Sequence, residues 1–337
     1  MGNLVMKRVA KPAGMFNIVL EDAPIPEVGP HDVRVCSARS LISRGSELWH
    51  RYIKEEAIDP RIMGYSVGGI VDAVGSEVTG FIPGDRVAIS APHAEYVVGD
   101  AHTHEFAEGN GPRVVALPDN VSFDQATFWP LTTSAVQWVG VDDIQPEHTV
   151  VIVGQGLVGS LMLQVAKANG DGRLIAIDAL PMRCDLASEL GADIVVNAST
   201  EDPLVRVLEL TNGFGADVVV YAVGGRAGLD AFAQAQQMVA RGGLLHVVGL
   251  YEDAPLPLSS RLIQRKRLIG GILPDSDRYK ASERALRLLA DGQIATDRMI
   301  THRFAYLEAA AAFRFLHDCP AEAFGVLLVW DATPLGS

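Results

Sequence analysis

The chain has few cysteines and lacks the spacings that cysteine-based sites require. Only three occur in 337 residues, Cys36, Cys184 and Cys319, and no two of them form a Cys-x-x-Cys pair. This spacing argues against a disulfide framework and against a structural zinc cluster. Because sparse, unpaired cysteines are typical of a reducing compartment, we expect a cytoplasmic protein.

Basic charge and long apolar runs are also scarce. Lys and Arg number 28 against 41 Asp and Glu, and the resulting net charge of −13 disfavours binding to nucleic acid and to anionic membranes. The longest apolar stretch, from Val150 to Ala166, is interrupted by glycines and polar residues, and no secretory signal is apparent. We therefore expect a globular protein with a small-molecule substrate, and neither a nucleic-acid nor a membrane partner.

Two patterns of apolar residues divide the chain. Before residue 118, short β-type runs separated by Gly, Pro and Asp predict a mostly antiparallel β domain. From about residue 148, apolar strands alternate with longer segments, which predicts a parallel α/β sheet. The predicted strands are Asp32–Val35, Gly69–Val74, Asp85–Ser90, Glu95–Val98, Arg113–Leu117, Val150–Val153, Leu174–Ile177, Asp193–Val196, Asp217–Ala222 and Leu244–Val248.

The C-terminal part returns to a different pattern. Beyond Asp275 we expect two helices, Lys280–Ala290 and Leu307–His317, followed by one short strand, Ala323–Trp330. This strand can complete the first domain, which is then discontinuous. The expected domains are residues 1–125 with 276–337, and residues 126–275.

A glycine-rich turn joins the strand Val150–Val153 to the helical pattern Ser160–Asn169. The turn reads Gly154-Gln155-Gly156-Leu157-Val158-Gly159, which is G-x-G-x-x-G. In this context the first glycine permits a tight turn, the second lets the backbone approach a pyrophosphate, and the third permits close helix–strand packing. The phosphates are expected at the helix N-terminus, where free N–H groups and the helix dipole favour an anion.

An acidic residue, Asp178, ends the next predicted strand. It follows the first glycine at close to the roughly 20-residue offset at which a carboxylate binds the adenosine ribose. A carboxylate there accepts hydrogen bonds from the ribose hydroxyls and repels a 2′-phosphate, which predicts NAD(H) rather than NADP(H). Arg183 is expected over the adenine, although a guanidinium can also bind a phosphate. The other predicted cofactor contacts are Ala222, Val223, Val248, Gly249 and Leu250.

Several segments, taken in order, resemble the medium-chain dehydrogenase/reductase superfamily of alcohol-dehydrogenase-like enzymes. The resemblance implies a GroES-like, mostly antiparallel β catalytic domain and a Rossmann domain with a doubly wound parallel sheet. It also implies a homodimer joined through the apolar edge strand Leu268–Leu273, which is an aggregation liability if left exposed. The matching segments are Gly64–Gly75, Gly84–Val87, His93–Val97, Leu117–Pro118, Glu189–Ala192 and Gly242–Leu244.

The chain departs from this family where zinc-dependent members hold their catalytic metal. Those members use a Cys, a His-Glu pair after a glycine, and a later Cys or Asp. The corresponding positions here are occupied by Arg44, Tyr65 and Trp129 or their neighbours, which do not supply the three N, S or O donors that zinc requires. The structural-zinc lobe is missing too. The chain therefore looks like a zinc-free member with no metal site.

Without a metal, side chains must orient the substrate oxygen and move its proton. By resemblance, Ser46 is the relay hydroxyl, although it can instead cap a helix that begins near Glu47. Tyr65 can donate to a developing alkoxide or simply fill the vacated metal volume. Glu47 is either part of this relay or a structural ion-pair partner of Arg44 or Arg39.

Two histidines are further candidates for the base, because imidazole titrates near neutrality, although a lone histidine is more often a framework residue. They are His50 and His93, of which His50 joins Ser46, Tyr65 and Glu47 in the predicted catalytic set. Arg44, Trp129 and Tyr251 form the predicted substrate-binding set.

Three functions remain in view. The first is a zinc-independent, NAD(H)-dependent oxidoreductase that transfers hydride between nicotinamide and a secondary alcohol or ketone, with a cyclic, polyol or sugar-like substrate by resemblance. The second is a quinone-oxidoreductase-like or enoyl reductase acting on a conjugated C=C bond. Such relatives usually take NADPH, whereas this chain has Asp178. The third is a catalytically silent cofactor-binding protein.

Overall fold

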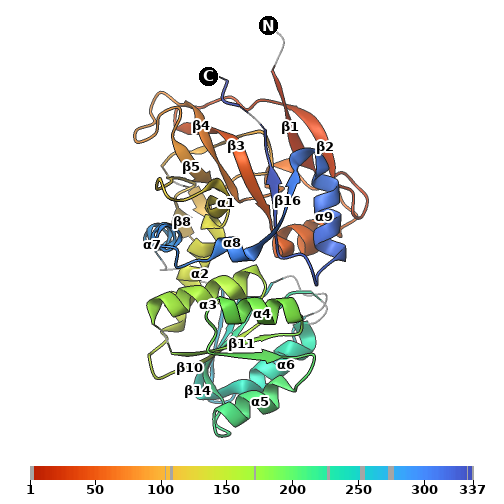
Figure 1. The fold of residues 1–337 in the computed structure, drawn as a ribbon, viewed down its shortest axis with the longest axis vertical. Helices are drawn as coiled ribbons and strands as arrows, with labels where there is room; N and C mark the ends of the chain where they lie inside the picture. Colours follow the sequence, from red (N-terminus) through yellow and green to blue (C-terminus); the bar gives the residue numbers. More distant parts are fainter. Residues whose placement is uncertain are drawn as a thin grey trace. The chain divides into compact units, whose positions relative to one another are not determined.

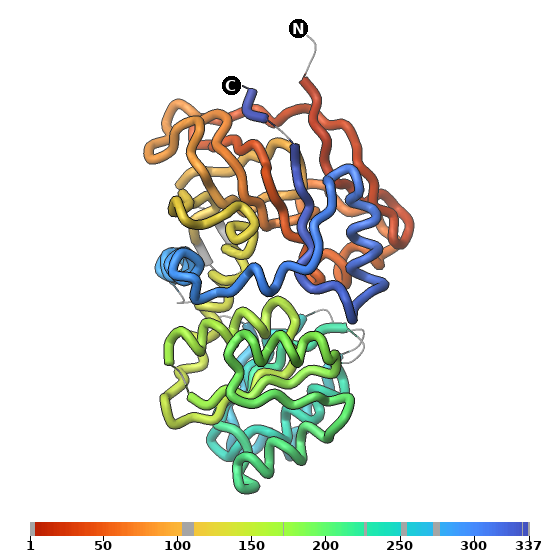
Figure 2. The backbone as a smooth tube through the Cα atoms, viewed as in Figure 1, coloured from red at the N-terminus to blue at the C-terminus, as the bar shows by residue number. Residues whose placement is uncertain are grey.

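A computed structural model of the chain describes residues 4–102, 104–106, 109–170, 172–225, 228–250, 255–271, 277–331 and 333–335. The chain forms two compact units. Unit 1 comprises Met1–Thr133 and Asp277–Ser337, and unit 2 comprises Ser134–Ser276. The N-terminal and C-terminal parts of the chain lie together in unit 1, as the red and blue ends of the tube in Figure 2 show. The first unit boundary falls inside helix α2 (Trp129–Asp142) rather than at residue 125/126.

Unit 1 is built on a seven-stranded sheet in the order β16-β17-β3-β4-β5-β9, with β6 also paired to β3. Its pairs are antiparallel apart from β16 with β17, so the expected fold class is confirmed. The strands are β3 (Asp32–Ile42), β4 (Val67–Val74), β5 (Arg86–Ile89), β6 (Tyr96–Asp100), β9 (Val114–Ala116), β16 (Ile300–Ala305) and β17 (Gly325–Val329).

Two small antiparallel sheets and β16 were not foreseen from the sequence. One sheet pairs β1 (Val5–Ala10) with β2 (Val19–Pro24), and the other pairs β7 (His104–Phe106) with β8 (Gly109–Gly111). The short helices of unit 1 are η1 (Arg44–Tyr52), η2 (Pro60–Ile62), α1 (Phe123–Ala126), α8 (Thr296–Met299) and η3 (Tyr306–Glu308). The two helices expected near the C-terminus form as α7 (Arg278–Ala290) and α9 (Ala309–Asp318).

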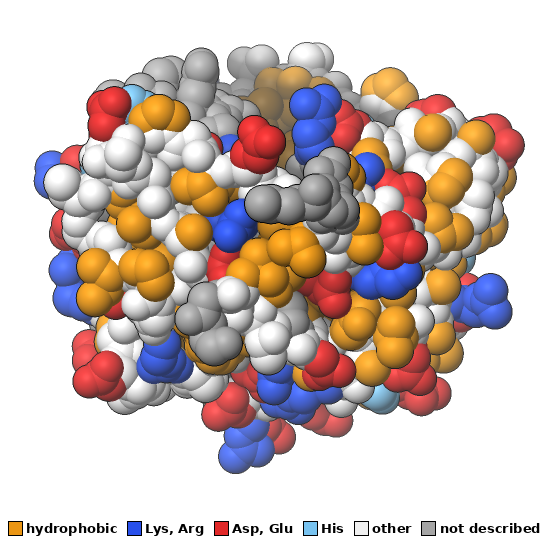
Figure 3. Space-filling view, turned by 90° about the horizontal axis from the view of Figure 1, so that it is seen from above, with side chains coloured by type: hydrophobic (Ala, Val, Ile, Leu, Met, Phe, Trp, Pro, Cys, Tyr) orange, Lys and Arg blue, Asp and Glu red, His pale blue; other side chains and the backbone are white. Residues whose placement is uncertain are grey.

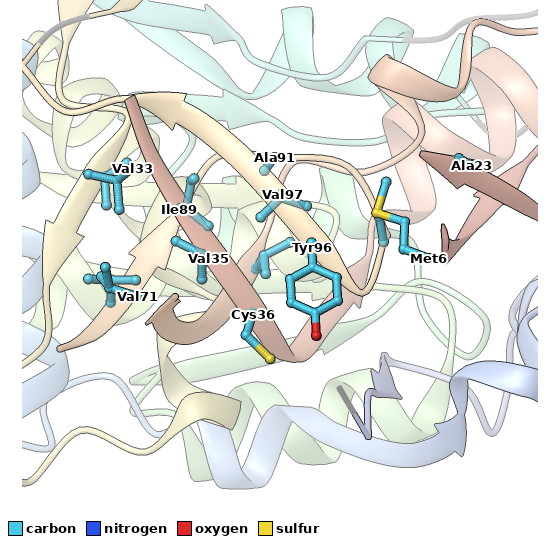
Figure 4. Close-up of a cluster of buried hydrophobic side chains, with 14 residues drawn as sticks. Met6, Ala23, Val33, Val35, Cys36, Val71, Ile89, Ala91, Tyr96 and Val97 are labelled. Carbon is cyan, nitrogen blue, oxygen red and sulfur yellow. The ribbon is translucent and has the colours of Figure 1, made fainter. Parts of the chain in front are cut away.

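Apolar side chains fill two clusters in unit 1. The first lies around β3 and β6 and includes Val33, Val35, Cys36 and Tyr96, which are drawn in Figure 4. The second lies where α9 packs beside β16 and β17, in blue in Figure 1, and includes Phe313. These clusters fix β3, the strand that leads into the candidate catalytic segment.

Unit 2 is a six-stranded parallel sheet in the order β12-β11-β10-β13-β14-β15. This order, with two halves wound outward from the first strand, is the doubly wound arrangement of dinucleotide-binding folds. Its elements are β10 (Thr149–Val153), α3 (Leu157–Asn169), β11 (Arg173–Asp178), α4 (Pro181–Glu189), β12 (Ile194–Asn197), α5 (Pro203–Leu210), β13 (Ala216–Tyr221), α6 (Gly228–Met238), β14 (Val239–Val247) and β15 (Arg267–Gly270).

The strands of unit 2 are nearly continuous apolar runs because helices cover parallel sheets on both faces. Val151 pairs with Ile175 on one side and Val219 on the other, and all three are fully buried. The edge strand β15 overlaps the predicted segment Leu268–Leu273 at residues 268–270, and residues 272 and 273 of that segment lie outside the described residues.

Two properties of the surface agree with the composition. On the face shown in Figure 3, basic, acidic and hydrophobic side chains are interspersed rather than gathered by type. Within the described ranges, no helix is both long enough and apolar enough to cross a membrane.

Candidate dinucleotide and catalytic sites

The glycine turn of unit 2 joins β10 to α3. Gly154 has a φ of +95°, which L side chains rarely adopt, and its N–H donates to the Ile177 carbonyl at 2.8 Å. A Cβ on Gly159 would lie 1.9 Å from the Gly154 carbonyl oxygen, so only glycine lets the helix pack this closely. A Cβ on Gly156 would meet no atom within 4 Å. The open backbone at Gly156 and the N-terminus of α3 are the features that a pyrophosphate requires.

Asp178 at the end of β11 lies directly beside this turn. Its Oδ2 accepts a hydrogen bond from the Gln155 N–H at 2.8 Å, and its Oδ1 accepts one from the Leu180 N–H at 2.9 Å. Each carboxylate oxygen has a further lone pair, so these bonds orient the group and leave acceptor capacity for a ligand. The carboxylate that the sequence assigns to the ribose is therefore held rigidly next to the glycine turn.

Arg183, which the sequence analysis expects over the adenine, lies beside Asp178. Its Nη1 lies 3.5 Å from Asp178 Oδ2, and its Nε is buried without a hydrogen-bond partner. The guanidinium is therefore paired with the ribose-side carboxylate. This partner reduces its availability for a 2′-phosphate, because the two charges largely satisfy each other.

The other predicted cofactor residues gather at the carboxyl ends of the same strands. Ala222 and Val223 follow β13, and a Cβ on Gly154 would lie 2.9 Å from each of them. Val248 and Gly249 follow β14 and both donate to the Tyr221 carbonyl. Leu250 follows them and is exposed, and Leu157 and Val158 begin α3, whereas the Gln155 side chain is buried and donates to the Ile152 carbonyl.

Three of the four predicted catalytic residues, Ser46, Glu47 and His50, lie on a π-helix, η1, whereas Tyr65 lies just before β4. The N–H of Ile53 accordingly donates to the Leu48 carbonyl, five residues earlier. π-Helical segments are rare and frequently occur at functional sites. Ser46 lies inside this helix and Ser43 is its N-cap, so the alternative that Ser46 caps a helix beginning near Glu47 is wrong.

Three hydroxyl groups meet at Ser43, and we call Ser43, Ser46 and Tyr65 the hydroxyl trio. Ser43 Oγ lies 2.9 Å from Ser46 Oγ and 2.9 Å from the Tyr65 hydroxyl. Ser43 is buried, whereas Ser46 and Tyr65 are half-buried. Ser43, which the sequence analysis did not single out, thus brings the predicted catalytic residues Ser46 and Tyr65 together.

Glu47 and His93 form a fully buried pair next to the trio. Glu47 Oε1 lies 2.8 Å from His93 Nε2, and Glu47 Oε2 accepts the Ser43 N–H at 2.7 Å. The expected ion pair of Glu47 with Arg44 or Arg39 is therefore wrong. Arg39 instead binds Asp124 at 2.9 Å, because β3 directs it toward α1.

Three further predicted residues belong to unit 1. His50 is exposed on η1, and Arg44 donates to the Ala323 carbonyl at 3.2 Å. Trp129 is buried, and its indole N–H donates to Ser282 on α7 at 3.0 Å. Tyr251, the last predicted substrate contact, lies outside the described residues.

The side chains of unit 1 were tested for their fit to a zinc ion. Among the described residues, no group of three or more His, Cys, Asp or Glu side chains converges on a common point. Glu47, three residues after Arg44, is bonded to His93. The His93 ring also lies against Gly64, where a Cβ would come within 2.9 Å of it. These residues do not fit a zinc site.

Sequence reasoning gave too little weight to Ser43 and His93. A serine directly before the predicted relay segment was visible, and a histidine at the start of the His93–Val97 segment was noted as a candidate base. Nothing local connects His93 to Glu47, which lies 46 residues earlier. The pairing follows only from the sheet that brings the two segments together.

The chain was compared with known proteins. A sequence model of the family described as "Zinc-binding dehydrogenase" matches residues 158–291. Sorbitol dehydrogenase of Bacillus subtilis (strain 168) is 27% identical over 92% of this chain and 95% of that protein. L-threonine 3-dehydrogenase of the same organism is 28% identical over 93% and 96%. The solved structure of alcohol dehydrogenase TADH from Thermus sp. ATN1 superposes with a TM-score of 0.80 at 26% identity, covering 96% of this chain and 100% of that one.

The doubly wound sheet, its glycine turn and the largely antiparallel partner unit together define the alcohol-dehydrogenase type of α/β fold. The full-length likenesses and the family match agree with that fold. In sequence and in fold, the chain is similar to the medium-chain, alcohol-dehydrogenase-like superfamily. The relatives reported above are named as dehydrogenases of sorbitol and of L-threonine.

Proposed function

We propose that the protein is an NAD(H)-dependent oxidoreductase that interconverts a secondary alcohol and its ketone without zinc. The observation that carries this proposal is the Asp178 carboxylate, held beside the glycine turn by the Gln155 and Leu180 N–H groups. Bound NAD(H) would supply or accept the hydride.

The choice of NAD(H) over NADP(H) depends on charge. A 2′-phosphate would face the Asp178 carboxylate, and like charges at such a distance repel each other in a partly buried site. The free 2′-hydroxyl of NAD(H) can instead donate to that carboxylate. The pairing of Arg183 with Asp178 supports this choice, because the Arg183 guanidinium, which could otherwise bind a 2′-phosphate, already contacts a carboxylate.

Zinc independence is proposed from the donor set in unit 1. A catalytic zinc needs three protein ligands and one open position. Glu47 and His93 satisfy each other, and Arg44, Tyr65 and Trp129 stand where the family's ligands are expected. We assign the handling of the substrate oxygen to Ser46 and Tyr65 instead. Their hydroxyls can donate to a ketone oxygen or accept from an alcohol.

The substrate class is proposed from the relatives. The two relatives described above are named for sorbitol and L-threonine, which both carry a secondary hydroxyl. We propose a cyclic, polyol or sugar-like secondary alcohol for this chain, bound with the help of Arg44, Trp129 and Tyr251 and with His50 as a further candidate base. The trio of neutral hydroxyl groups suits such an uncharged, oxygen-rich substrate.

A cofactor and substrate screen tests the proposal. The full chain is incubated with NADH or NADPH and either ketones or conjugated enones, and the absorbance of reduced nicotinamide is followed. Turnover of ketones with NADH is expected. Turnover of enones with NADPH would instead establish the enoyl-reductase alternative, and NADH binding without any turnover would establish a silent cofactor-binding protein.

We also propose that the protein is a cytoplasmic homodimer. Strand β15 lies at the edge of the unit 2 sheet, and its Leu268 is 43% exposed. An apolar edge strand is a site for pairing with a second chain, and pairing two such edges by two-fold symmetry satisfies both. Light scattering at micromolar concentration should give twice the mass of one chain, and a monomer would contradict the proposal.

A further inference from the structure

We propose that Ser43 is a positioning residue that aligns the Ser46 and Tyr65 hydroxyls, and that the buried His93–Glu47 pair holds Ser43 in place. This inference rests on the proposed function, because it gives that reaction's oxygen-handling groups a support. It replaces the separate roles expected for Ser46, Tyr65 and Glu47 with one connected assembly.

The first argument is the hydrogen-bonding capacity of the trio. Three hydroxyl groups hold three protons and share two contacts, both at 2.9 Å and both on Ser43 Oγ. At least one O–H is therefore directed outside the trio. It can donate to a ketone oxygen, and rotation of the hydroxyls lets the trio accept from an alcohol instead. Ser43 is the only member in contact with both others, so its loss separates the two candidate groups.

The second argument is a chain of buried hydrogen bonds that supports Ser43. We call its members, Trp330, Ser40, His93 and Glu47, the anchor. The Trp330 indole N–H can only donate, and it lies 2.9 Å from Ser40 Oγ. Ser40 Oγ lies 2.8 Å from His93 Nδ1, and His93 Nε2 lies 2.8 Å from Glu47 Oε1. One arrangement satisfies every group: Trp330 donates to Ser40, Ser40 to His93, and His93 to the Glu47 carboxylate.

The chain of donors ends at the Glu47 carboxylate, which also accepts a hydrogen bond from Ser43. The second carboxylate oxygen of Glu47 accepts the Ser43 N–H at 2.7 Å, at the residue where η1 begins. This bond fixes the backbone that carries the shared hydroxyl. The buried carboxylate thus acts on Ser43 directly and on Ser46 and Tyr65 through it.

A purely structural role explains this arrangement less well. Burying a carboxylate costs several kcal/mol, and buried ion pairs can often be replaced by apolar residues without loss of stability. Glu47, His93 and Ser40 are all fully buried, so the cost of burying this pair is paid in full. Their hydrogen bonds connect to the hydroxyl trio, whose half-buried members Ser46 and Tyr65 are proposed to contact the substrate oxygen.

The hydroxyl of Ser43 is tested first, in the full chain and with a substrate found in the screen. Ser43→Ala should lower kcat roughly ten- to hundredfold and change KM by less than about threefold. Ser43→Thr, which keeps a hydroxyl, should restore most of kcat. Ser37→Ala is the matched control, because Ser37 is a buried serine on β3, the strand that leads to Ser43, and its hydroxyl has no hydrogen-bond partner.

The outcomes separate this inference from the proposed function. Ser43→Ala with unchanged kcat, or with the same loss as Ser43→Thr, overturns the positioning role while leaving the enzyme assignment intact. Loss of NADH binding in Ser43→Ala would also contradict it, because the glycine turn lies in unit 2. A wild-type chain without turnover refutes the proposed function itself.

The anchor has a test that needs no turnover. Amide hydrogen exchange over residues 43–52 should accelerate roughly tenfold or more in His93→Leu, because Glu47 loses its partner and η1 loosens. His246→Leu is the control, since it breaks a second buried pair, His246 with Asp142, in unit 2. Unchanged exchange over 43–52 in His93→Leu, or equal acceleration in both variants, overturns the anchor.

Discussion

The two candidate sites of this protein are built in opposite ways. The site of unit 2 consists mainly of backbone: a glycine turn, the N-terminus of α3 and one carboxylate held by two N–H groups. The site of unit 1 consists of side chains from segments far apart in sequence. Glu47 meets His93, and Ser43 meets Tyr65.

The two sites should therefore differ in which amino-acid substitutions they tolerate. A backbone site depends on local conformation, so a single added methyl group can destroy it. A side-chain network depends on each partner being present, so removing one hydroxyl leaves the fold intact and changes the chemistry. Substitutions of the same size should therefore have different consequences in the two units.

The largest expected effect comes from Gly159→Ala in unit 2. The new Cβ would lie 1.9 Å from the Gly154 carbonyl oxygen, so helix and turn must separate, at a cost of about 1–3 kcal/mol or more. We expect a lower midpoint of thermal unfolding together with loss of NADH binding. Calorimetry and a fluorescence titration measure the two effects.

Gly156→Ala is the matched control for that prediction. Its Cβ would meet no protein atom within 4 Å, so stability should be nearly unchanged while NADH binding weakens at least about tenfold. Equal destabilisation by both substitutions would show that Gly156 is a packing residue and not part of a pyrophosphate site.

The next largest effect is expected for Asp178→Ala. Losing two charge-assisted hydrogen bonds to the ribose, each contributing roughly 1.5–3 kcal/mol, should weaken NADH binding about a hundredfold or more. NADPH binding should hardly change, because the repelling charge is removed and Arg183 is released. Titrations with both cofactors check this.

Asp178→Asn serves as the control for local structure. It keeps one acceptor for the Gln155 or Leu180 N–H group while removing the charge. Wild-type binding of NADPH as tight as that of NADH, or equal loss of both cofactors in Asp178→Ala, would mean that Asp178 is not the ribose ligand.

The same contrast describes how far the sequence alone could lead. The glycine turn and Asp178 are local features separated by a characteristic number of residues, and the strands around them are continuous apolar runs that the sequence shows directly. By contrast, β16 lies at the edge of its sheet, and its charged and polar residues hide the strand pattern. The partner of Glu47 was missed because charge alone favours arginine, whereas the folded sheet places His93 there.

A smaller effect is expected for the rate of cysteine alkylation, which can be compared in both units because each contains cysteine. Burial, with Asp72 and Glu95 nearby, raises the pKa of Cys36 to about 12, and burial also raises the pKa of Cys184. The thiolate forms only as pH rises through the pKa, so both should resist alkylation at pH 8. Cys36 packs among apolar side chains beside Tyr96 (Figure 4). Mass spectrometry after iodoacetamide treatment should find Cys319 modified first, and early labelling of Cys36 would indicate local opening of β3.

Removing metal is expected to have no effect on the protein. A strong chelator should leave both activity and the unfolding midpoint unchanged, because Glu47 and His93 are bonded to each other instead of facing an open coordination position. Elemental measurement on the untreated protein accompanies the assay. One zinc per chain, lost together with activity, would overturn zinc independence and with it the comparison between the two sites.

The pairing of β17 with β3 has a consequence for how the protein is made. β17 pairs with residues 39–42 of β3, and Val326 is the partner of Ile42, so this end of β3 lacks that neighbour until residue 326 has been synthesised. At roughly 5–20 residues per second, this interval lasts from about 15 seconds to about a minute. Unit 2 is synthesised within it and can fold first. Ser40, at this end of β3, then receives the hydrogen bond from Trp330, so the support under Ser43 is completed only once residue 330 has been synthesised.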